Sequence, residues 1–325
     1  MTFLWPYEIP ILIWIQHLGA WLIPPMKFFS LLGTEEFFLL ILSALYWCID
    51  SRIGLRVAIT LLISNTVNDS LKLLFRGARP YWVDSSIKGI NHEASFGVPS
   101  GHAQNSMVVW GTLALGFRKR WLTVLSCVVI FLVGFSRMVL GVHWISDVIA
   151  GWIIGLVLLW LVARFEKPVV KWWVSKQIGM QILFSAVIAI VMIVVGYAWK
   201  SVFASWQAPA EWLTNIASNF PGASPDPASF SNAFTLAGLW FGMLAGASLI
   251  HAAGDHHIPK TAGQKIAAYL IGLLGVLILW YGLRIIFPRS EDILSYSLRF
   301  IRYSLVGLWI VFLAPLVFKK IKLSL

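Results

Sequence analysis

Long apolar stretches alternate with short polar ones along this chain. A helix that crosses a membrane needs about 20 largely apolar residues. The stretch from Trp121 to Val162 is long enough for two such helices, so it must turn once. Gly141 is the natural place for the turn, because glycine tolerates backbone angles that other residues avoid. The whole pattern predicts spans near 34–50, 53–76, 101–117, 121–139, 144–164, 179–199, 231–252, 265–287 and 300–318.

These spans predict an all-α fold, a polytopic transmembrane helical bundle. We expect a core of about six helices in residues 1–166, together with the N-terminal segment, and about four additional transmembrane helices in residues 167–325. A short linker is expected near 165–178 and a loop rich in Pro, Ser and Ala at 200–229. Residues 7–33 are apolar but contain Pro24 and Pro25, so they either span or lie in the interface as a Trp-rich helix; the interfacial alternative is favoured.

The composition supports a membrane protein. Hydrophobic residues make up 59% of the chain and charged ones only 12%, which excludes an ordinary soluble domain. Eighteen tryptophans fit the aromatic belts of membrane interfaces. The net charge of +11 does not indicate nucleic acid, because the basic residues are scattered between apolar spans. Cys48 and Cys127 lie in apolar segments and are expected to be unpaired buried thiols, and the start of the chain lacks the features of a cleavable signal peptide.

Three ionisable residues lie beside the predicted turn. Arg137 precedes Gly141, and His143 and Asp147 follow it. Ionisable groups in lipid are costly, so they favour a functional site, with a polar pair joining two helices as the alternative. His143 and Asp147 are four residues apart and share one helical face. A carboxylate one turn from an imidazole can hold one ring nitrogen and present the other as a nucleophile.

The span at 53–76 carries a polar stripe that is expected to face the bundle. For its two asparagines, Asn65 and Asn68, hydrogen bonds between helices are the favoured role. This span ends on one membrane face, called side X, where the span at 101–117 begins. The two helices around the turn also meet side X. Groups far apart in sequence are therefore expected to converge there: Lys72, Arg79, Ser100, Gly101, His102, Arg137, His143 and Asp147.

The composition of this cluster indicates an anionic ligand. Arginines present paired donors that match phosphate oxygens, and the helix that begins after Ser100 offers free backbone N–H groups. Arg76 either joins this cationic clamp, pairs with Asp69 or contacts a lipid headgroup. No carboxylate cluster or Cys/His spacing suits a metal, so neither a metal nor another cofactor is expected.

Three segments in this order resemble the signature motifs of the type 2 phosphatidic acid phosphatase superfamily: Lys72-x6-Arg79-Pro80, Pro99-Ser100-Gly101-His102 and Ser136-Arg137-x5-His143-x3-Asp147. That superfamily includes lipid phosphate phosphatases, glucose-6-phosphatase and vanadium haloperoxidases. The resemblance covers about residues 35–165, and the second half lies outside it. It implies that His143 attacks phosphorus, that Asp147 orients it, and that His102 protonates the leaving alcohol and then activates water. It also implies a phosphate site made by Lys72, Arg79, Ser100, the Gly101 amide and Arg137.

These features predict an integral membrane phosphatase that hydrolyses a lipid phosphate monoester or pyrophosphate through a phosphohistidine. Its expected partners are the lipid phosphate substrate and membrane lipids, and no nucleic acid. One alternative is a lipid phosphotransferase that uses an acceptor other than water. The other is a binding or transport protein for anionic lipids, which is disfavoured because transporters place their charged sites near the bilayer midplane rather than at helix ends.

The distribution of basic residues predicts the side of the membrane, because Lys and Arg in short loops tend to stay in the cytoplasm. The face opposite X carries the larger share: Arg52, Arg56, Arg118, Lys119, Arg120, Arg164, Lys167, Lys171, Lys176, Lys260, Lys265, Lys319, Lys320 and Lys322. Apart from the proposed site, side X carries Lys88, Lys200, Arg284, Arg289, Arg299 and Arg302. We therefore expect a multi-pass protein of the cell membrane with its active site on the extracytoplasmic side.

Two polar groups in the second half are also expected to lie between or beside spans. Asp255, His256 and His257 are expected to form a solvated turn rather than a metal site. Four arginines lie near tyrosines on side X, at positions 284, 289, 299 and 302. Interfacial anchoring is the favoured role of these arginines, and selection of a lipid headgroup is the alternative.

Overall fold

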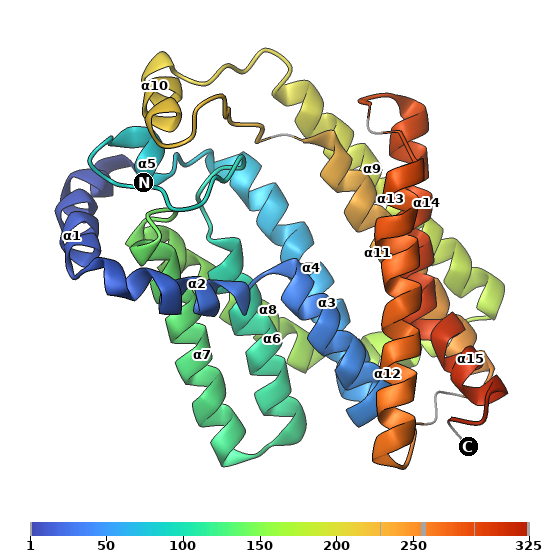
Figure 1. Ribbon diagram of the computed structural model, residues 1–325. Coiled ribbons are helices and arrows are strands. Elements are labelled where there is room, and N and C mark those ends of the chain that lie inside the picture. Colours follow the sequence, from blue (N-terminus) through green and yellow to red (C-terminus); the bar gives the residue numbers. More distant parts are fainter. Residues whose placement is uncertain (1, 228, 255–257, 289, 324–325) are drawn as a thin grey trace. The chain divides into compact units, whose positions relative to one another are not determined.

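The computed structural model describes residues 2–227, 229–254, 258–288 and 290–323. Within these ranges the chain is helical and has no strand, which confirms the all-α prediction (Figure 1). The predicted turn at Asp255, His256 and His257 lies outside the described residues, as does Arg289. The elements are η1 (Thr2–Leu4), α1 (Trp5–His17), η2 (Ala20–Leu22), α2 (Ile23–Leu31), α3 (Glu35–Ala44), η3 (Leu45–Ile49), α4 (Ser51–Phe75), α5 (Pro80–Val83), α6 (Gly101–Phe117), α7 (Arg120–Val139), α8 (Ile145–Val174), α9 (Ile178–Val202), α10 (Ala210–Asn219), α11 (Phe230–Ala252), α12 (Ala262–Leu277), η4 (Ile278–Gly282), α13 (Leu283–Ile286), α14 (Ile293–Leu308), η5 (Trp309–Leu313) and α15 (Ala314–Lys320).

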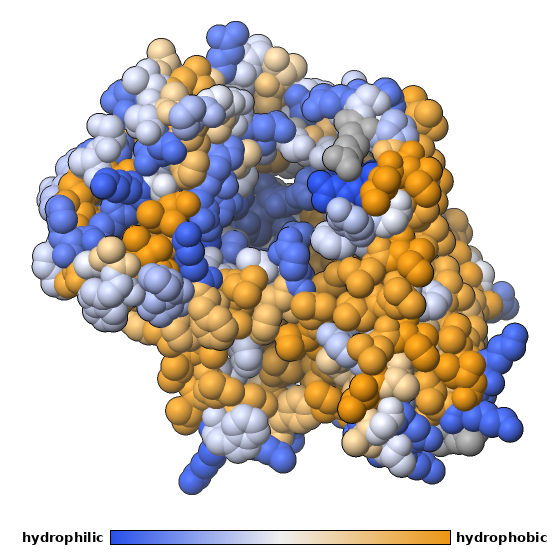
Figure 2. Space-filling model, viewed as in Figure 1, coloured by the Kyte–Doolittle hydropathy of each residue, from blue (hydrophilic) through white to orange (hydrophobic). Residues whose placement is uncertain are grey.

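Six helical runs among the described residues are long and apolar enough to cross a membrane: Arg120–Val139, Ile145–Val174, Ile178–Val202, Phe230–Ala252, Ala262–Ile286 and Ile293–Lys320. A seventh candidate is the N-terminal pair of helical runs, which bends by 86° at its break. The polar stripe of α4 and the 17-residue length of α6 keep these helices out of the set. Exposed apolar side chains cover long stretches of the helix surfaces, as lipid contact requires (Figure 2). The chain is a multi-pass membrane protein.

The chain divides into two compact units that interleave along the sequence. Unit 1 combines Met1–Phe38, Ile63–Val162 and Phe203–Ala228, and unit 2 combines Leu39–Leu62, Ala163–Val202 and Ser229–Leu325. The interleaving arises because α3, α4 and α8 each begin in one unit and end in the other. The predicted division of the chain into residues 1–166 and 167–325 stays a prediction; it separates the sequence at one point, whereas each compact unit combines several segments.

Two segments differ from the sequence prediction. α8 continues through the expected linker to Val174, because Val169, Val170 and Trp172 prolong its apolar sequence and Pro168 removes only one backbone donor. The loop predicted at 200–229 contains the helix α10. Its buried Ile216 lies on the side that packs against α5, which explains why this short segment is ordered as a helix.

The polar stripe of α4 pairs with α6 inside unit 1. Ser64 Oγ donates to Asn105 Oδ1 at 2.7 Å, and Asn105 Nδ2 donates to Asn65 Oδ1 at 2.7 Å. Asn68 Nδ2 donates to Gln104 Oε1 at 2.9 Å. These bonds confirm the favoured role of the two asparagines. A bond of this kind between membrane helices contributes about 0.6 kcal/mol, so the network sets the register of α4 against α6 more than it adds stability.

The N-terminal helices support the turn between α7 and α8. Both α1 and α2 pack against α7. Glu8 of α1 accepts a hydrogen bond from the Ser146 backbone N–H at 2.7 Å, which places a carboxylate at the positive end of α8. The Trp5 ring stacks on Trp144, with ring centroids 5.5 Å apart. The segment 7–33 is therefore part of the protein wall around this turn, and its position relative to the membrane stays a prediction.

Glycines bring α11 and α14 into close contact inside unit 2. A Cβ added at Gly238 would lie 2.6 Å from the Phe300 carbonyl oxygen, and one at Gly242 would lie 2.1 Å from that of Ser304. Glycines four residues apart on one face allow two helix backbones to approach in this way, and packing of this kind drives helix association in membranes. This close approach fixes the position of α14 against α11, and with it the position of the buried Arg302 on α14.

Candidate active site

The turn between α7 and α8 presents His143. Gly141 has φ +68°, and a Cβ there would lie 2.3 Å from the Lys88 carbonyl oxygen, so both backbone angle and space require glycine. His143 is buried and lies in the turn just before α8, not on the helix itself as predicted. The reason is that Asp147 Oδ2 accepts the Trp144 backbone N–H at 3.0 Å and so begins the helix after His143. The predicted pair still forms, with His143 Nδ1 3.3 Å from Asp147 Oδ2.

Arg79 fixes the tautomer of His143. Its Nη1 lies 3.2 Å from His143 Nε2. A guanidinium can only donate, so Nε2 must accept with its lone pair, and the ring proton lies on Nδ1 beside Asp147. Burial, followed by the charge of Arg79, holds the pKa of His143 well below its usual value of 6.5. The imidazole is therefore neutral at neutral pH, with its unprotonated Nε2 toward the arginine.

The same arginine is held rigidly by the loop that precedes α6. Arg79 is fully buried and donates to the Ser95 carbonyl at 2.7 Å, the Phe96 carbonyl at 3.2 Å and the Val142 carbonyl at 3.0 Å. Lys72 Nζ donates to Ser95 Oγ at 2.9 Å. Hydrogen bonds to backbone oxygens do not neutralise the guanidinium charge, so the cluster attracts an anionic group.

Glu93 occupies this cationic cluster, and sequence reasoning missed it. Its carboxylate forms a short ion pair with Arg137 Nη2 and lies 3.7 Å from Arg79 Nη2. Burial opposes its ionisation, but the charges of Arg79 and Arg137 lower the pKa of Glu93 far below its usual range. Its two carboxylate oxygens therefore lie beside two guanidinium groups. The only sequence signal for Glu93 was its position in the loop before Pro99-Ser100-Gly101-His102. No spacing rule links Glu93 to the arginines, so this signal was too weak for a prediction.

The start of α6 lies beside these groups. Ser100 is the N-cap of α6, and its backbone N–H donates to the Asp147 carbonyl at 3.0 Å. A Cβ at Gly101 would lie 3.1 Å from Asn68 Oδ1, so this residue packs closely on α4. The His102 imidazole interacts electrostatically with Arg137 and Glu93. The structure thus brings together all eight residues singled out by the sequence, within unit 1.

Two buried polar atoms of the cluster have no hydrogen-bond partner among the described residues: Arg137 Nε and Asp147 Oδ1. Arg137 Nη1 donates to Ser30 Oγ of α2 at 2.6 Å, a second contact that the sequence did not predict. The Arg76 guanidinium lies over the Phe203 ring, 4.6 Å from the centroid, a contact that the sequence did not predict, and its three predicted roles stay predictions. Across the described parts of the chain, no three His, Cys, Asp or Glu side chains are grouped to hold a metal ion.

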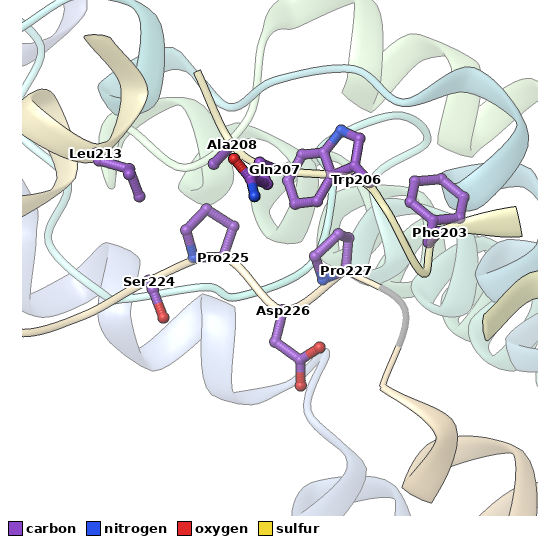
Figure 3. Close-up of a pocket in the computed structure, with 9 residues that line it drawn as sticks. All are labelled: Phe203, Trp206, Gln207, Ala208, Leu213, Ser224, Pro225, Asp226 and Pro227. Carbon is purple, nitrogen blue, oxygen red and sulfur yellow. The ribbon is translucent and has the colours of Figure 1, made fainter. Parts of the chain in front are cut away.

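Residues 203–227 cover the loop that holds Arg79. Phe96 packs against Phe203 and Trp206, with ring centroids 5.8 and 5.4 Å apart. The Asp226 N–H donates to the Ala94 carbonyl at 3.0 Å. Two stretches of this covering segment, 203–208 and 224–227, face each other across a pocket of about 420 Å³ (Figure 3). A segment far along the sequence therefore supports the backbone oxygens that position Arg79.

Trp206→Ala tests this support. Loss of the ring leaves Phe96 without one of its three aromatic neighbours, Trp82, Phe203 and Trp206. The Ser95 and Phe96 carbonyls are then expected to shift, and Arg79 to lose its orientation. We expect kcat/KM to fall about tenfold, because small displacements of positioning groups have effects of this size or larger. Phosphate release by the purified variant measures it. Trp160→Ala, which removes an exposed tryptophan, is the matched control and should stay near wild type; equal activities of the two variants would contradict the role of Trp206.

Comparison with known proteins decides the family. The profile of the PAP2 superfamily matches residues 53–171, and that of the PAP2 superfamily phosphatase transmembrane extension matches residues 234–325. An undecaprenyl-diphosphatase of Sulfolobus acidocaldarius is 30% identical over 144 residues, which cover 44% of this chain and 69% of that protein. The chain belongs to the PAP2 superfamily. Residues 234–325, for which the sequence motifs gave no match, therefore correspond to the transmembrane extension of PAP2 phosphatases.

Other PAP2 proteins are also similar. Phosphatidylglycerophosphatase B of Bacillus subtilis (strain 168) is 29% identical over 162 residues, covering 46% of this chain and 77% of that protein. The crystal structure of a transmembrane PAP2-type phosphatidylglycerolphosphate phosphatase from Bacillus subtilis matches with a TM-score of 0.40 and 27% identity, covering 49% of this chain and 86% of that one. The family and these curated relatives make the chain a phosphatase.

Proposed function

We propose that this protein hydrolyses a lipid phosphate through a covalent phosphohistidine on His143. The observation that carries the proposal is the contact between Arg79 and His143. It leaves the Nε2 lone pair of a neutral imidazole beside guanidinium groups that attract phosphate. A nucleophile oriented by a carboxylate and placed next to an anion site is the arrangement that covalent phosphoryl transfer needs.

The first half of the reaction transfers the phosphoryl group to the enzyme. The substrate phosphate displaces the Glu93 carboxylate and is bound by Lys72, Arg79, Ser100, the Gly101 amide and Arg137. Nε2 of His143 forms a bond to phosphorus as the bond from phosphorus to the leaving oxygen breaks. Protonated His102 gives its proton to that oxygen, so the lipid alcohol departs neutral. Asp147 accepts the Nδ1–H hydrogen bond and stabilises the positive charge that develops on His143.

The second half regenerates the enzyme. His102 is now neutral and removes a proton from water as the water oxygen attacks phosphorus. The bond from phosphorus to Nε2 breaks, inorganic phosphate forms, and His143 returns to its neutral state with the proton on Nδ1. The arginines stabilise the charge of both transition states, which is the main contribution a protein makes to phosphoryl transfer.

The substrate class follows from the membrane setting and from the relatives. The helices that carry the site are embedded in an apolar surface, so a substrate with lipid chains can reach it from the bilayer. The similar proteins are named for a phosphatidylglycerophosphate and an undecaprenyl diphosphate substrate. Phosphate release by purified protein in detergent, measured on phosphatidylglycerol phosphate, undecaprenyl pyrophosphate, phosphatidic acid and sphingosine 1-phosphate, tests the proposal. No release from any of them would overturn it.

The reaction is expected to need no divalent metal, because arginines, a lysine and a helix N-terminus supply the positive charge. Activity should survive dialysis against EDTA. Orthovanadate should inhibit, because its five-coordinate adduct with an imidazole nitrogen resembles the transferring phosphoryl group. Phosphate release before and after chelation measures the first effect. Complete loss in EDTA that is restored by a divalent metal would contradict this mechanism.

The active site is proposed to face away from the cytoplasm, and cysteine labelling tests this. Ser86 lies in the loop beside the site and Lys119 at the far end of α6, and both are exposed. After Cys48 and Cys127 are replaced, a membrane-impermeant thiol reagent on intact cells should label Ser86→Cys and spare Lys119→Cys. Labelling in permeabilised cells is the control that both thiols can react. The reverse pattern would place the site in the cytoplasm.

A further inference from the structure

Unit 2 contains a pocket of about 300 Å³ that no step of the proposed reaction uses. Its walls come from η4, α13, the following connection and the first turns of α14, all within unit 2. Three arginines line it, Arg284, Arg299 and Arg302, together with the aromatic side chains of Trp280, Tyr296 and Tyr303. A concave site with convergent charged groups and aromatic walls is a typical place for a small ligand.

Arg302 is the most informative of these residues. It lies ten residues into the membrane-spanning run Ile293–Lys320, and only 6% of its surface is exposed. Its Nε has no hydrogen-bond partner among the described residues. Its guanidinium lies over the Tyr303 ring, 4.9 Å from the centroid, its side chain also hydrogen-bonds Tyr303, and both residues line the pocket. A buried arginine donor without an acceptor is costly, so it marks a place that a ligand oxygen can fill.

The charges of the pocket favour an anion. Arg299 donates only a long bond, 3.4 Å from Nη1 to Thr235 Oγ1, and Arg284 is exposed to solvent. The acidic lining residue, Glu291, lies 3.9 Å from Lys200 Nζ, so a cation outside the lining offsets its charge. Three arginines therefore line the pocket with one carboxylate, Glu291, whose charge is offset by Lys200, so the net charge of the lining is positive. Guanidinium groups present paired N–H donors that match the oxygens of phosphate.

We propose that this pocket binds a phosphate monoester group, held by Arg284, Arg299 and Arg302. The group can belong to the headgroup of a membrane lipid or to free inorganic phosphate, because the same three arginines would recognise either. The spacing of α14 supports the assignment: Arg299 and Arg302 are three residues apart and Tyr296 and Tyr303 flank them, so one helical face carries the site. The site is made by other residues than the catalytic cluster, and it stands whether or not the phosphohistidine mechanism is correct.

Protection from phenylglyoxal, which modifies accessible arginines, tests the proposal residue by residue. The full chain is purified in an uncharged detergent as the His143→Ala variant, so that an added lipid phosphate stays intact. One arm contains inorganic phosphate, a second contains dioctanoyl phosphatidic acid, and a third contains dioctanoylglycerol, which lacks phosphate. Peptide mass spectrometry then measures the modification rates of Arg284 and Arg299. At a ligand concentration about ten times Kd, modification should slow about tenfold. The exposed Arg118 should react equally in all arms.

The three arms separate the possible sources. Protection by both phosphate compounds, or by only one of them, supports the site and identifies what it accepts. No protection by either, or equal protection by dioctanoylglycerol, overturns it. Arg302→Gln should abolish the protection of Arg284 and Arg299. Because loss of a buried arginine can disturb folding, Arg299→Gln provides a second variant, read at Arg284, and thermal unfolding confirms that both variants fold.

Discussion

His143→Ala is expected to reduce kcat by about 10⁴-fold or more, because removal of a catalytic nucleophile leaves only binding and charge stabilisation. No phosphoenzyme can form without Nε2. The protein should still fold, since alanine fills the turn before α8 without strain and the Trp144 and Asp147 contacts that begin the helix involve backbone and carboxylate. Single-turnover assays with radiolabelled substrate, followed by a quench at alkaline pH where phosphohistidine is stable, measure both turnover and the covalent intermediate.

The matched control is His17→Ala, which removes an exposed histidine of α1 and should leave the rate unchanged. His102→Ala should also be slow, because it removes the acid and base, yet it keeps the nucleophile. With a substrate whose leaving group needs no proton, this variant should accumulate labelled enzyme while His143→Ala does not. Activity of His143→Ala within tenfold of the wild type would show that the nucleophile has been assigned wrongly.

Arg79→Lys is expected to lower kcat/KM by about 10²–10³-fold, the size of effect seen when one donor to a transition-state oxyanion is removed. The positive charge remains, but an ammonium cannot reproduce the planar contacts to the Ser95, Phe96 and Val142 carbonyls while also donating to His143 Nε2. The hydrogen bond that selects the His143 tautomer is therefore lost, and the phosphate is bound more weakly. Steady-state kinetics on a lipid phosphate, together with the inhibition constant of orthovanadate, measure the change.

The vanadate constant separates a role in the reaction from a role in folding. If Arg79 acts on the transferring phosphoryl group, vanadate binding should weaken in proportion to kcat/KM. Arg118→Lys, at the exposed end of α6, is the control and should change neither quantity. A variant with a lowered melting temperature but an unchanged vanadate constant would leave Arg79 with a purely structural role.

Glu93 shows how the tertiary structure changes the picture of the phosphate site. From the sequence, the arginines form an open clamp. In the structure, the Glu93 carboxylate pairs with Arg137 and approaches Arg79. In the proposed mechanism, the substrate phosphate replaces it. The sequence could not predict this, because the loop between α5 and α6 has no periodic pattern and its path depends on the packing of Phe96 against residues from 203 onward.

The sequence by itself determined what depends on local patterns. Hydropathy along the chain set the positions of the spans, because burial of a helix in lipid depends on its own roughly 20 residues. Gly141 determined the position of the turn. The positions of the polar residues from Lys72 to Asp147, relative to the spans, placed them at helix ends. These features need no knowledge of which helices touch.

Only the tertiary structure decided the contacts between segments distant along the chain. Glu8 accepts a hydrogen bond from the first turn of α8 although it lies more than a hundred residues away, Ser30 binds Arg137, and the segment after Phe203 covers the loop that holds Arg79. The burial of Arg302 beside Arg299 follows likewise from the close approach of α14 to the glycines of α11. The physical reason is the same in each case. Side-chain packing and hydrogen-bond geometry depend on which surfaces meet in space, and a hydropathy pattern is silent about that.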